Sequence, residues 1–250
     1  MGVLRLSIDP GNERPPLAYL AATDPDDASR RVIYVHGTPG SSGAWRAFLR
    51  QPPPGTESIA IDRPGFGRSG PRGPVVSFEE QAAVLRPLLD SPDGDRPILV
   101  GHSLGGPIIA RAAADYPDQV AGLILVSASL DPQFENVGLM QGLASTPPVR
   151  GVLPRALRNS LVELLAGREQ TEALAEVLHR VRCPVIIIHG TRDRLVPYAN
   201  VEYMQRTLTG AASVEVVALD RANHFLPWTH EQTIREAIER LDAMADARNR

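Results

Sequence analysis

The sequence predicts an α/β fold in which a mostly parallel sheet carries helices on both faces. Short, continuous apolar runs rich in Val, Ile and Leu recur along the chain, which is typical of strands buried on both sides. Between them lie segments whose apolar residues are spaced by three and four, which is typical of amphipathic helices. Strands that alternate with helices favour a parallel sheet covered on both faces.

Eight segments are predicted to form the strands. The first two, residues 3–8 and 17–22, flank a turn-prone stretch and predict a hairpin. The other six are apolar runs bounded by Gly, Pro or charged residues, at 32–35, 58–61, 98–100, 123–126, 185–188 and 214–218.

Helices are predicted for residues 78–89, 104–114, 198–208 and 231–244. Residues 131–181 break the strand–helix rhythm, because they contain only short helical patterns, at 161–165 and 172–178, together with several prolines. We therefore expect a small helical insertion at 131–181 within a core domain formed by residues 1–130 and 182–250.

Composition excludes several classes of protein. The 250 residues are 43% hydrophobic, and the net charge of −3 is not gathered in blocks, so nucleic-acid binding through a basic face is not expected. The single cysteine, Cys183, cannot form an internal disulfide and is predicted to be a small buried residue. The chain has neither a signal-peptide pattern nor a run of the ~20 apolar residues that span a membrane. We expect a cytoplasmic protein without a membrane partner, and the sequence does not predict its oligomeric state.

The strongest chemical signal is Gly-His-Ser-Leu-Gly at residues 101–105. It follows a predicted strand and precedes a predicted helix, the setting in which Gly-x-Ser-x-Gly forms a tight turn that exposes the serine hydroxyl. The turn also places the serine at a helix N-terminus, where free N–H groups stabilise negative charge. Ser103 is therefore the candidate nucleophile, and the alternative is an ordinary glycine-rich turn with a serine cap.

A serine hydroxyl needs a histidine base that is held by a carboxylate. His224 follows the last predicted strand, where its loop can reach the carboxyl edge of the sheet. Two carboxylates compete to orient it, Asp193 and Asp131, because each follows a predicted strand. Asp193 is favoured by the order Ser, acid, His along the chain. Asp131 precedes Pro132 and also fits a turn that opens the insertion.

The other five histidines are not expected to act as the base. His36 and His189 stand at strand ends before glycine and are expected to pack against loops or to brace them. His102 adjoins the serine and is expected to point elsewhere on the turn, and His179 and His230 are expected to be solvated.

The chain resembles the α/β-hydrolase family over nearly its whole length. Five motifs carry the resemblance in the family's order: 36–40 as the oxyanion loop, 62–69 as the turn after the fourth strand, 101–105 as the nucleophile elbow, 190–193 as the acid loop and 223–225 as the histidine loop. The resemblance implies an eight-stranded sheet, a lid over the active site formed by residues 131–181, and an oxyanion hole made by the backbone N–H groups of Thr38 and Leu104.

These residues favour a serine hydrolase that cleaves a small or medium carboxylic ester through an acyl-enzyme, with neither an organic cofactor nor a metal. The same triad serves carbon–carbon bond hydrolysis, thioester hydrolysis and acyl transfer, so those activities stay open. A cofactor-free perhydrolase and a receptor-like binding protein with little turnover are further alternatives. Related enzymes that cleave epoxides or carbon–halogen bonds carry aspartate as nucleophile, which disfavours those activities here. Aminopeptidase relatives usually have a second glycine at the position of Thr38 and a larger insertion, so peptidase activity is also disfavoured.

The walls of the substrate pocket are expected to come from the insertion and from the loops near the triad. The candidates, which fit a buried core equally well, are Phe134, Leu139, Met140, Leu195, Phe225 and Trp228.

Overall fold

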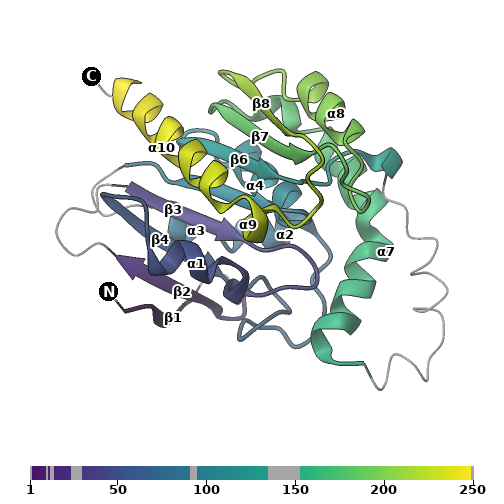
Figure 1. Cartoon of the computed structure of the whole chain (residues 1–250). Coiled ribbons are helices and arrows are strands. Elements are labelled where there is room, and N and C mark those ends of the chain that lie inside the picture. Colours follow the sequence, from purple (N-terminus) through teal and green to yellow (C-terminus); the bar gives the residue numbers. More distant parts are fainter. Residues whose placement is uncertain are drawn as a thin grey trace.

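The protein forms one eight-stranded, mostly parallel sheet in the order β1-β2-β4-β3-β5-β6-β7-β8 (Figure 1). The computed structural model describes residues 2–9, 11, 14–23, 30–90, 95–134 and 153–248. The strands are β1 (Leu4–Ile8), β2 (Leu17–Thr23), β3 (Arg30–Val35), β4 (Thr56–Ile61), β5 (Ile98–His102), β6 (Gly122–Val126), β7 (Val185–Gly190) and β8 (Val214–Leu219). Strand β2 is antiparallel to β1 and β4, and all other neighbours are parallel. The predicted fold class is confirmed, as are all eight predicted strands.

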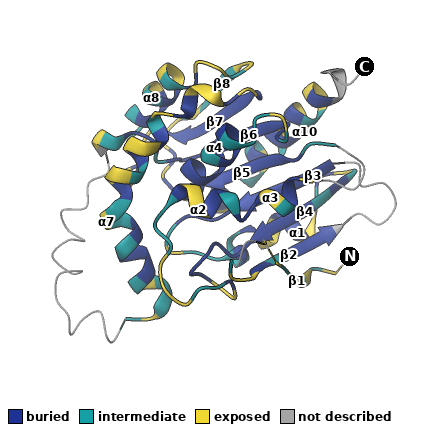
Figure 2. Cartoon of the chain, turned by 180° about the vertical axis from the view of Figure 1, so that it is seen from behind, coloured by how far each residue is buried: buried dark blue, intermediate teal, exposed yellow. Residues whose placement is uncertain are grey.

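Helices cover both faces of the sheet (Figures 1 and 2). The helices of the described residues are η1 (Ser42–Trp45), α1 (Arg46–Arg50), α2 (Phe78–Ala83), α3 (Arg86–Leu89), α4 (Gly105–Asp115), η2 (Pro132–Phe134), α7 (Arg155–Ala175), η3 (Leu178–Arg180), α8 (Ala199–Thr207), α9 (Leu226–Thr229) and α10 (Glu231–Arg248). Successive strand residues point to opposite faces, so Leu123 and Leu125 of β6 pack under α4, whereas Ile124 and Val126 pack under α10. This alternation produces two apolar layers, one on each side of the sheet.

Two helical regions differ from the sequence prediction. The expected helix at 78–89 is divided into α2 and α3, because Pro87 cannot donate a backbone hydrogen bond and disfavours a helical residue before it. The pair η1 and α1 lies in a stretch for which no helix is predicted. The hydroxyl of Ser41 caps η1 by accepting from the N–H of Gly43, and the buried rings of Trp45 and Phe48 anchor the pair to β3 and β4.

The predicted insertion contains one continuous helix of 21 residues, α7, instead of two short ones. It begins directly after Pro154, which is favourable because proline at a helix start loses no helical hydrogen bond. The face of α7 turned toward the core includes the buried polar residues Asn159, Ser160 and Glu163. Residues 135–152 lie outside the described part of the chain, and the assignment of 131–181 as a lid domain stays a prediction.

No helix in the described ranges combines the length and the apolar character that crossing a membrane requires.

Candidate active site

Ser103 occupies a strained turn between β5 and α4. Its φ angle is +53°, in the left-handed region that few residues other than glycine adopt. The surrounding chain holds this conformation, because the N–H of Ser103 donates to the carbonyl of Val126 at 3.0 Å and its carbonyl accepts from Gly106 N–H at 3.0 Å. A residue kept in such a conformation by its surroundings is typical of a functional position.

Glycines allow neighbouring backbone to approach the turn closely. A Cβ atom on Gly105 would lie 2.3 Å from the carbonyl oxygen of Val35, and one on Gly37 would lie 2.9 Å from Cβ of Ser103. The loop that follows β3 therefore runs directly against the serine, as an oxyanion loop must.

Replacing Gly105 by alanine is expected to destabilise the fold by about 3 kcal/mol, because the added methyl group must displace β3 from the turn. Alanine is otherwise favoured over glycine in a helix, so any loss reports the steric contact. The matched control is Gly73→Ala, since a Cβ at Gly73 has no atom within 4 Å. Urea unfolding measures both, and equal midpoints for the two variants would contradict the expectation.

His224 and Asp193 form a buried pair at the carboxyl edge of the sheet. Nδ1 of His224 donates to Oδ2 of Asp193 at 2.8 Å. The other carboxylate oxygen, Oδ1, accepts the backbone N–H groups of Leu195 and Val196 at 2.9 and 2.8 Å. Burial by itself raises the pKa of Asp193, but the hydrogen bonds from His224 and from the two N–H groups outweigh it and lower the pKa below the usual range.

This pairing sets the protonation of the imidazole. A carboxylate only accepts, so Nδ1 of His224 carries the proton and Nε2 of the neutral ring keeps a lone pair. A histidine in this tautomer can act as a general base.

His102 connects the serine turn to the histidine loop, a contact that the sequence does not predict. Its Nε2–H donates to the carbonyl oxygen of His224 at 2.9 Å, and the two rings lie 4.8 Å apart between centroids. The ring of His102 is thus engaged by the backbone of the histidine loop, and its exclusion from the triad stays a prediction. Because His102 precedes Ser103 directly, the contact places the histidine loop beside the serine turn.

Asp131, the competing carboxylate, stabilises a turn with its side chain. Its Oδ1 accepts the N–H of Gln133 at 2.9 Å at the start of η2, and its own N–H donates to the side chain of Asn200 at 2.9 Å. The hydrogen bond donated by Nδ1 of His224 is accepted by Asp193, the carboxylate that the sequence favours.

His36 and His189 brace loops, as expected. Nδ1 of His36 donates to the carbonyl of Gly37 at 2.7 Å, and its Nε2 accepts the N–H of Arg63 at 3.1 Å. His189 donates from Nε2 to the carbonyl of Val196 at 3.0 Å. Burial lowers the pKa of His36, His102 and His189, to about 3 for His36 and about 4 for His102.

Acid is therefore expected to destabilise the protein before most carboxylates titrate. Below pH ~6.5 the unfolded chain binds a proton at each histidine, whereas folded His36 and His102 stay neutral down to about pH 3 and 4. The contribution of these histidines to the free energy of unfolding is fully present above pH ~6.5. It decreases as the pH is lowered, by about 2 kcal/mol per histidine between pH 7 and 5. Urea unfolding at the two pH values measures the loss, and His36→Gln should reduce it. The matched control is the exposed His179, whose replacement by glutamine should leave the loss unchanged. A wild type equally stable at both pH values would contradict the prediction.

Thr38 and Leu104 flank the serine turn. Leu104 is buried directly before α4, and Thr38 follows Gly37 in the loop that contacts Ser103. The hydroxyl of Thr38 lies 2.8 Å from both the hydroxyl of Ser160 and Oε2 of Glu163 on α7. The role of their backbone N–H groups as oxyanion donors stays a prediction.

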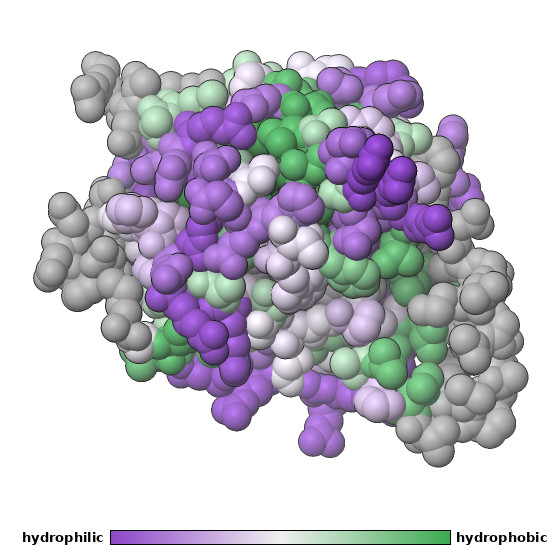
Figure 3. All heavy atoms as spheres, viewed as in Figure 1, coloured by the Kyte–Doolittle hydropathy of each residue, from purple (hydrophilic) through white to green (hydrophobic). Residues whose placement is uncertain are grey.

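Three of the predicted pocket residues are exposed side chains in the acid and histidine loops or directly after them. Leu195 is 64% exposed, Phe225 51% and Trp228 56%, and the Trp228 ring lies 5.7 Å from that of His102. Hydrophobic residues on the face drawn in Figure 3 are interrupted by hydrophilic ones. Only the backbone of Phe134 is described, and Leu139 and Met140 lie outside the described residues. The lining of the pocket stays a prediction.

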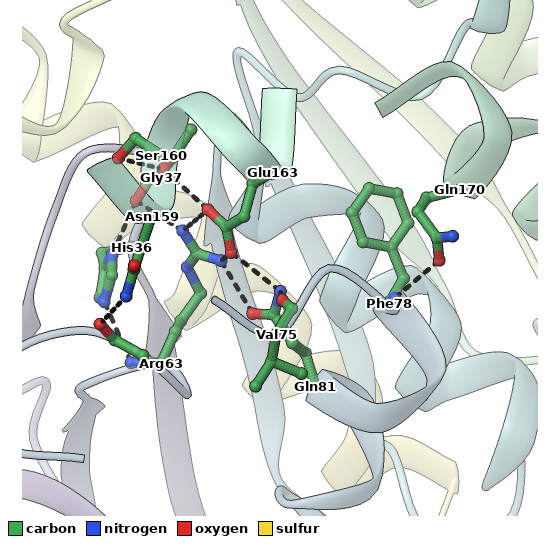
Figure 4. Close-up of polar contacts among 12 residues, drawn as sticks. His36, Gly37, Arg63, Val75, Phe78, Gln81, Asn159, Ser160, Glu163 and Gln170 are labelled. Atoms are coloured by element: carbon green, nitrogen blue, oxygen red, sulfur yellow. Dashed lines mark hydrogen bonds and ion pairs between the residues drawn. The ribbon is translucent and has the colours of Figure 1, made fainter. Parts of the chain in front are cut away.

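The polar network around Arg63 was not predicted. Arg63 follows β4 in the recognised 62–69 turn, and its partner Glu163 lies on α7 (Figure 4). A single acidic residue in a helical pattern is usually solvated, so nothing in the sequence marks Glu163 as buried.

Comparison with known proteins identifies the family of the chain. Residues 30–171 match the family model described as alpha/beta hydrolase fold. A 2-hydroxy-6-oxononadienedioate/2-hydroxy-6-oxononatrienedioate hydrolase of Paraburkholderia phymatum is 26% identical over 83% of this chain and 85% of its own length. Two solved structures share the fold. A putative aryl esterase from Burkholderia cenocepacia has a TM-score of 0.75, 20% identity and coverage of 98% of this chain and 100% of that one. A 2-hydroxy-6-oxo-6-phenylhexa-2,4-dienoate hydrolase from Rhodococcus has a TM-score of 0.74, 18% identity and coverage of 97% and 99%. The chain thus belongs to the alpha/beta-hydrolase family, and the protein is an enzyme of that family.

Proposed function

We propose that the protein hydrolyses a carboxylic ester through an acyl-enzyme, with Ser103 as nucleophile, His224 as base and Asp193 as the orienting acid. The observation that carries the proposal is the buried 2.8 Å hydrogen bond between His224 and Asp193, taken together with the strained turn that holds Ser103. A nucleophile on a tight turn, beside a base held by a carboxylate, is the arrangement that acyl transfer requires.

The reaction would proceed in two steps. Nε2 of His224 takes the hydroxyl proton as Oγ of Ser103 bonds to the acyl carbon, and the charge that develops on the carbonyl oxygen is stabilised by the N–H groups of Thr38 and Leu104. The carbon–oxygen bond of the ester then breaks, and His224 returns the proton to the leaving alkoxide. Water, deprotonated by His224, releases the acid and regenerates Ser103. Asp193 stabilises the imidazolium in both steps.

The charges beside the oxyanion loop favour a neutral acyl group. The guanidinium of Arg63 contacts Gly37 next to Thr38, but it is buried and paired with Glu163 at 2.7 Å. A charge that is already compensated adds little attraction for a substrate carboxylate. The exposed apolar side chains of Leu195, Phe225 and Trp228, in or next to the acid and histidine loops, are also suited to an uncharged ester.

Carbon–carbon bond hydrolysis is the second candidate, and the curated relatives favour it. The Paraburkholderia phymatum relative is named for a dienedioate, a substrate class with two carboxylates. The same serine attack on a ketone carbonyl would expel a stabilised carbanion in place of an alkoxide, and His224 would supply its proton.

Intact-mass spectrometry with a small fluorophosphonate tests the shared step. Wild type should gain one adduct, and Ser103→Ala should gain none. No adduct on folded wild type would contradict an activated serine.

Turnover then separates the two candidates. A panel of p-nitrophenyl acetate, butyrate and octanoate is compared with a 2-hydroxy-6-oxo-dienedioate as the carbon–carbon substrate. We expect a higher kcat/KM for the esters, and the reverse order would favour the second candidate.

A further inference from the structure

A buried ion pair joins helix α7 to the core beside the candidate oxyanion loop. The side chains of Arg63 and Glu163 are 0% and 1% exposed, and the two groups meet in a fork with N–O distances of 2.7 and 3.1 Å (Figure 4). Such a pair contributes little net stability compared with apolar residues, because removing both charges from water is costly. Its position therefore needs another explanation.

The guanidinium also contacts the peptide that carries the candidate oxyanion donor. Nη2 of Arg63 donates to the carbonyl oxygen of Gly37 at 3.1 Å, and Nδ1 of His36 donates to the same oxygen at 2.7 Å. The Gly37 carbonyl and the Thr38 N–H belong to one planar trans peptide, so they point in opposite directions. Two donors that hold the oxygen on one side therefore aim the Thr38 N–H to the other side.

A guanidinium that donates directly to the oxygen does more than orient this peptide, although Glu163 compensates its charge for groups farther away. Hydrogen bonds polarise one another in a low-dielectric interior, so a guanidinium on the Gly37 oxygen makes the Thr38 N–H a stronger donor. This strengthening acts where negative charge would develop in the transition state.

Glu163 holds both Arg63 and the side chain of Thr38. Its Oε2 accepts from Arg63 and from the Thr38 hydroxyl at 2.8 Å, and its Oε1 accepts from Arg63 and from Nε2 of Gln81 at 3.0 Å. Each carboxylate oxygen thus has two donors, and each of these contacts depends on α7 lying against the loop (Figure 4).

We propose that Arg63 and Glu163 are positioning residues that aim and polarise the Thr38 N–H, so that the docking of α7 completes the oxyanion hole. This inference rests on the proposed serine mechanism. Arg63 acts through the Gly37–Thr38 peptide and does not touch the substrate. Helix α7 therefore contributes to the rate of the chemical step as well as covering part of the core.

The test uses the double variant Arg63→Met with Glu163→Gln. Removal of Glu163 alone would leave a buried unpaired charge and unfold the protein, whereas removal of both charges is tolerated in other buried pairs. The matched control is Arg31→Met with Glu57→Gln, which breaks a 2.7 Å pair at the opposite end of β3 and β4. Urea unfolding confirms that both double variants are folded.

We expect kcat for p-nitrophenyl butyrate to fall about tenfold to hundredfold in the Arg63/Glu163 variant, with KM changed less than threefold, because the oxyanion contact strengthens in the transition state. Phenylboronic acid forms a tetrahedral adduct on an active serine and places an oxygen in the oxyanion hole. Its affinity should fall by a factor similar to that of kcat, and the control should match wild type in every measurement. A folded variant with wild-type kcat and boronate affinity would overturn the inference.

The amide resonance of Thr38 in ¹⁵N-labelled protein reports the peptide without any substrate. We expect this resonance to move upfield in the Arg63/Glu163 variant and to stay in place in the control. An unchanged resonance would overturn the inference whether or not wild type hydrolyses esters. Absence of turnover and of a fluorophosphonate adduct in wild type would instead contradict the proposed function.

Discussion

Replacement of His224 by alanine is expected to lower kcat for a p-nitrophenyl ester by about 10⁵-fold or more, because a serine hydroxyl without a base is a poor nucleophile. Alanine also removes the proton donor for the leaving group, so both chemical steps lose the same residue. Asp193 would keep its two backbone N–H donors, and the fold should therefore survive. Initial rates at pH 8 and urea unfolding measure the two effects separately.

Added imidazole sharpens this experiment. The truncated side chain leaves space beside Ser103, and free imidazole at high concentration should restore part of the activity of His224→Ala. The matched control is His230→Ala, six residues further along the chain, whose described side-chain contact is with its neighbour Thr229. A folded His224→Ala protein that keeps more than about 1% of wild-type kcat would contradict the role of His224 as base.

The central strands could be predicted because burial on both faces leaves continuous apolar runs in the sequence. Residues 185–188 are a continuous apolar run, and all of β7 is buried between two strands and two helical layers. Such a run has few alternatives once glycine or proline bounds it. The parallel arrangement followed from the alternation of these runs with helical patterns.

Helix α7 could not be predicted as one element, because its inward face is partly polar. Asn159 donates to the carbonyl of Gly65 at 2.8 Å, Ser160 lies against Thr38, and Glu163 is paired with Arg63. Hydrophobic periodicity identifies a helix only when its buried side is apolar. The polar residues that interrupt the apolar pattern of the helix are the same ones that bind it to the loops after β3 and β4.

Chain order and local context identified the candidate triad, whereas the supporting contacts needed three dimensions. The strand-to-helix setting of Ser103 and the position of His224 after the last strand are both visible in the sequence. The hydrogen bond from His102 to the His224 carbonyl joins residues separated by 122 positions, and no local pattern marks it. Long-range polar contacts of this kind depend on the packing of loops, which leaves no periodic signal.

Replacement of Asp193 by asparagine is expected to lower kcat about 10⁴-fold with little change in KM. An asparagine side chain can present its NH₂ group to His224, which favours the imidazole tautomer with the lone pair on Nδ1 and leaves no base facing Ser103. The carbonyl oxygen of the amide can still accept the N–H groups of Leu195 and Val196, so the loop should keep its shape. The expected loss is therefore chemical and not structural.

Asp131→Asn is the matched comparison, because Asp131 is the other buried carboxylate that follows a neighbouring strand. An amide oxygen can still accept the N–H of Gln133, so this variant should keep kcat within a fewfold of wild type. The reverse order of effects would transfer the role of the acid to Asp131.

The combination of Asp193→Asn with His224→Ala tests whether Asp193 acts through His224. Asp193 acts through the imidazole, so once His224 is absent the second substitution should cost almost nothing further. A double variant slower than His224→Ala by another factor of about 10⁴ would mean that Asp193 acts independently of His224, and the 2.8 Å hydrogen bond would then not be the source of its effect.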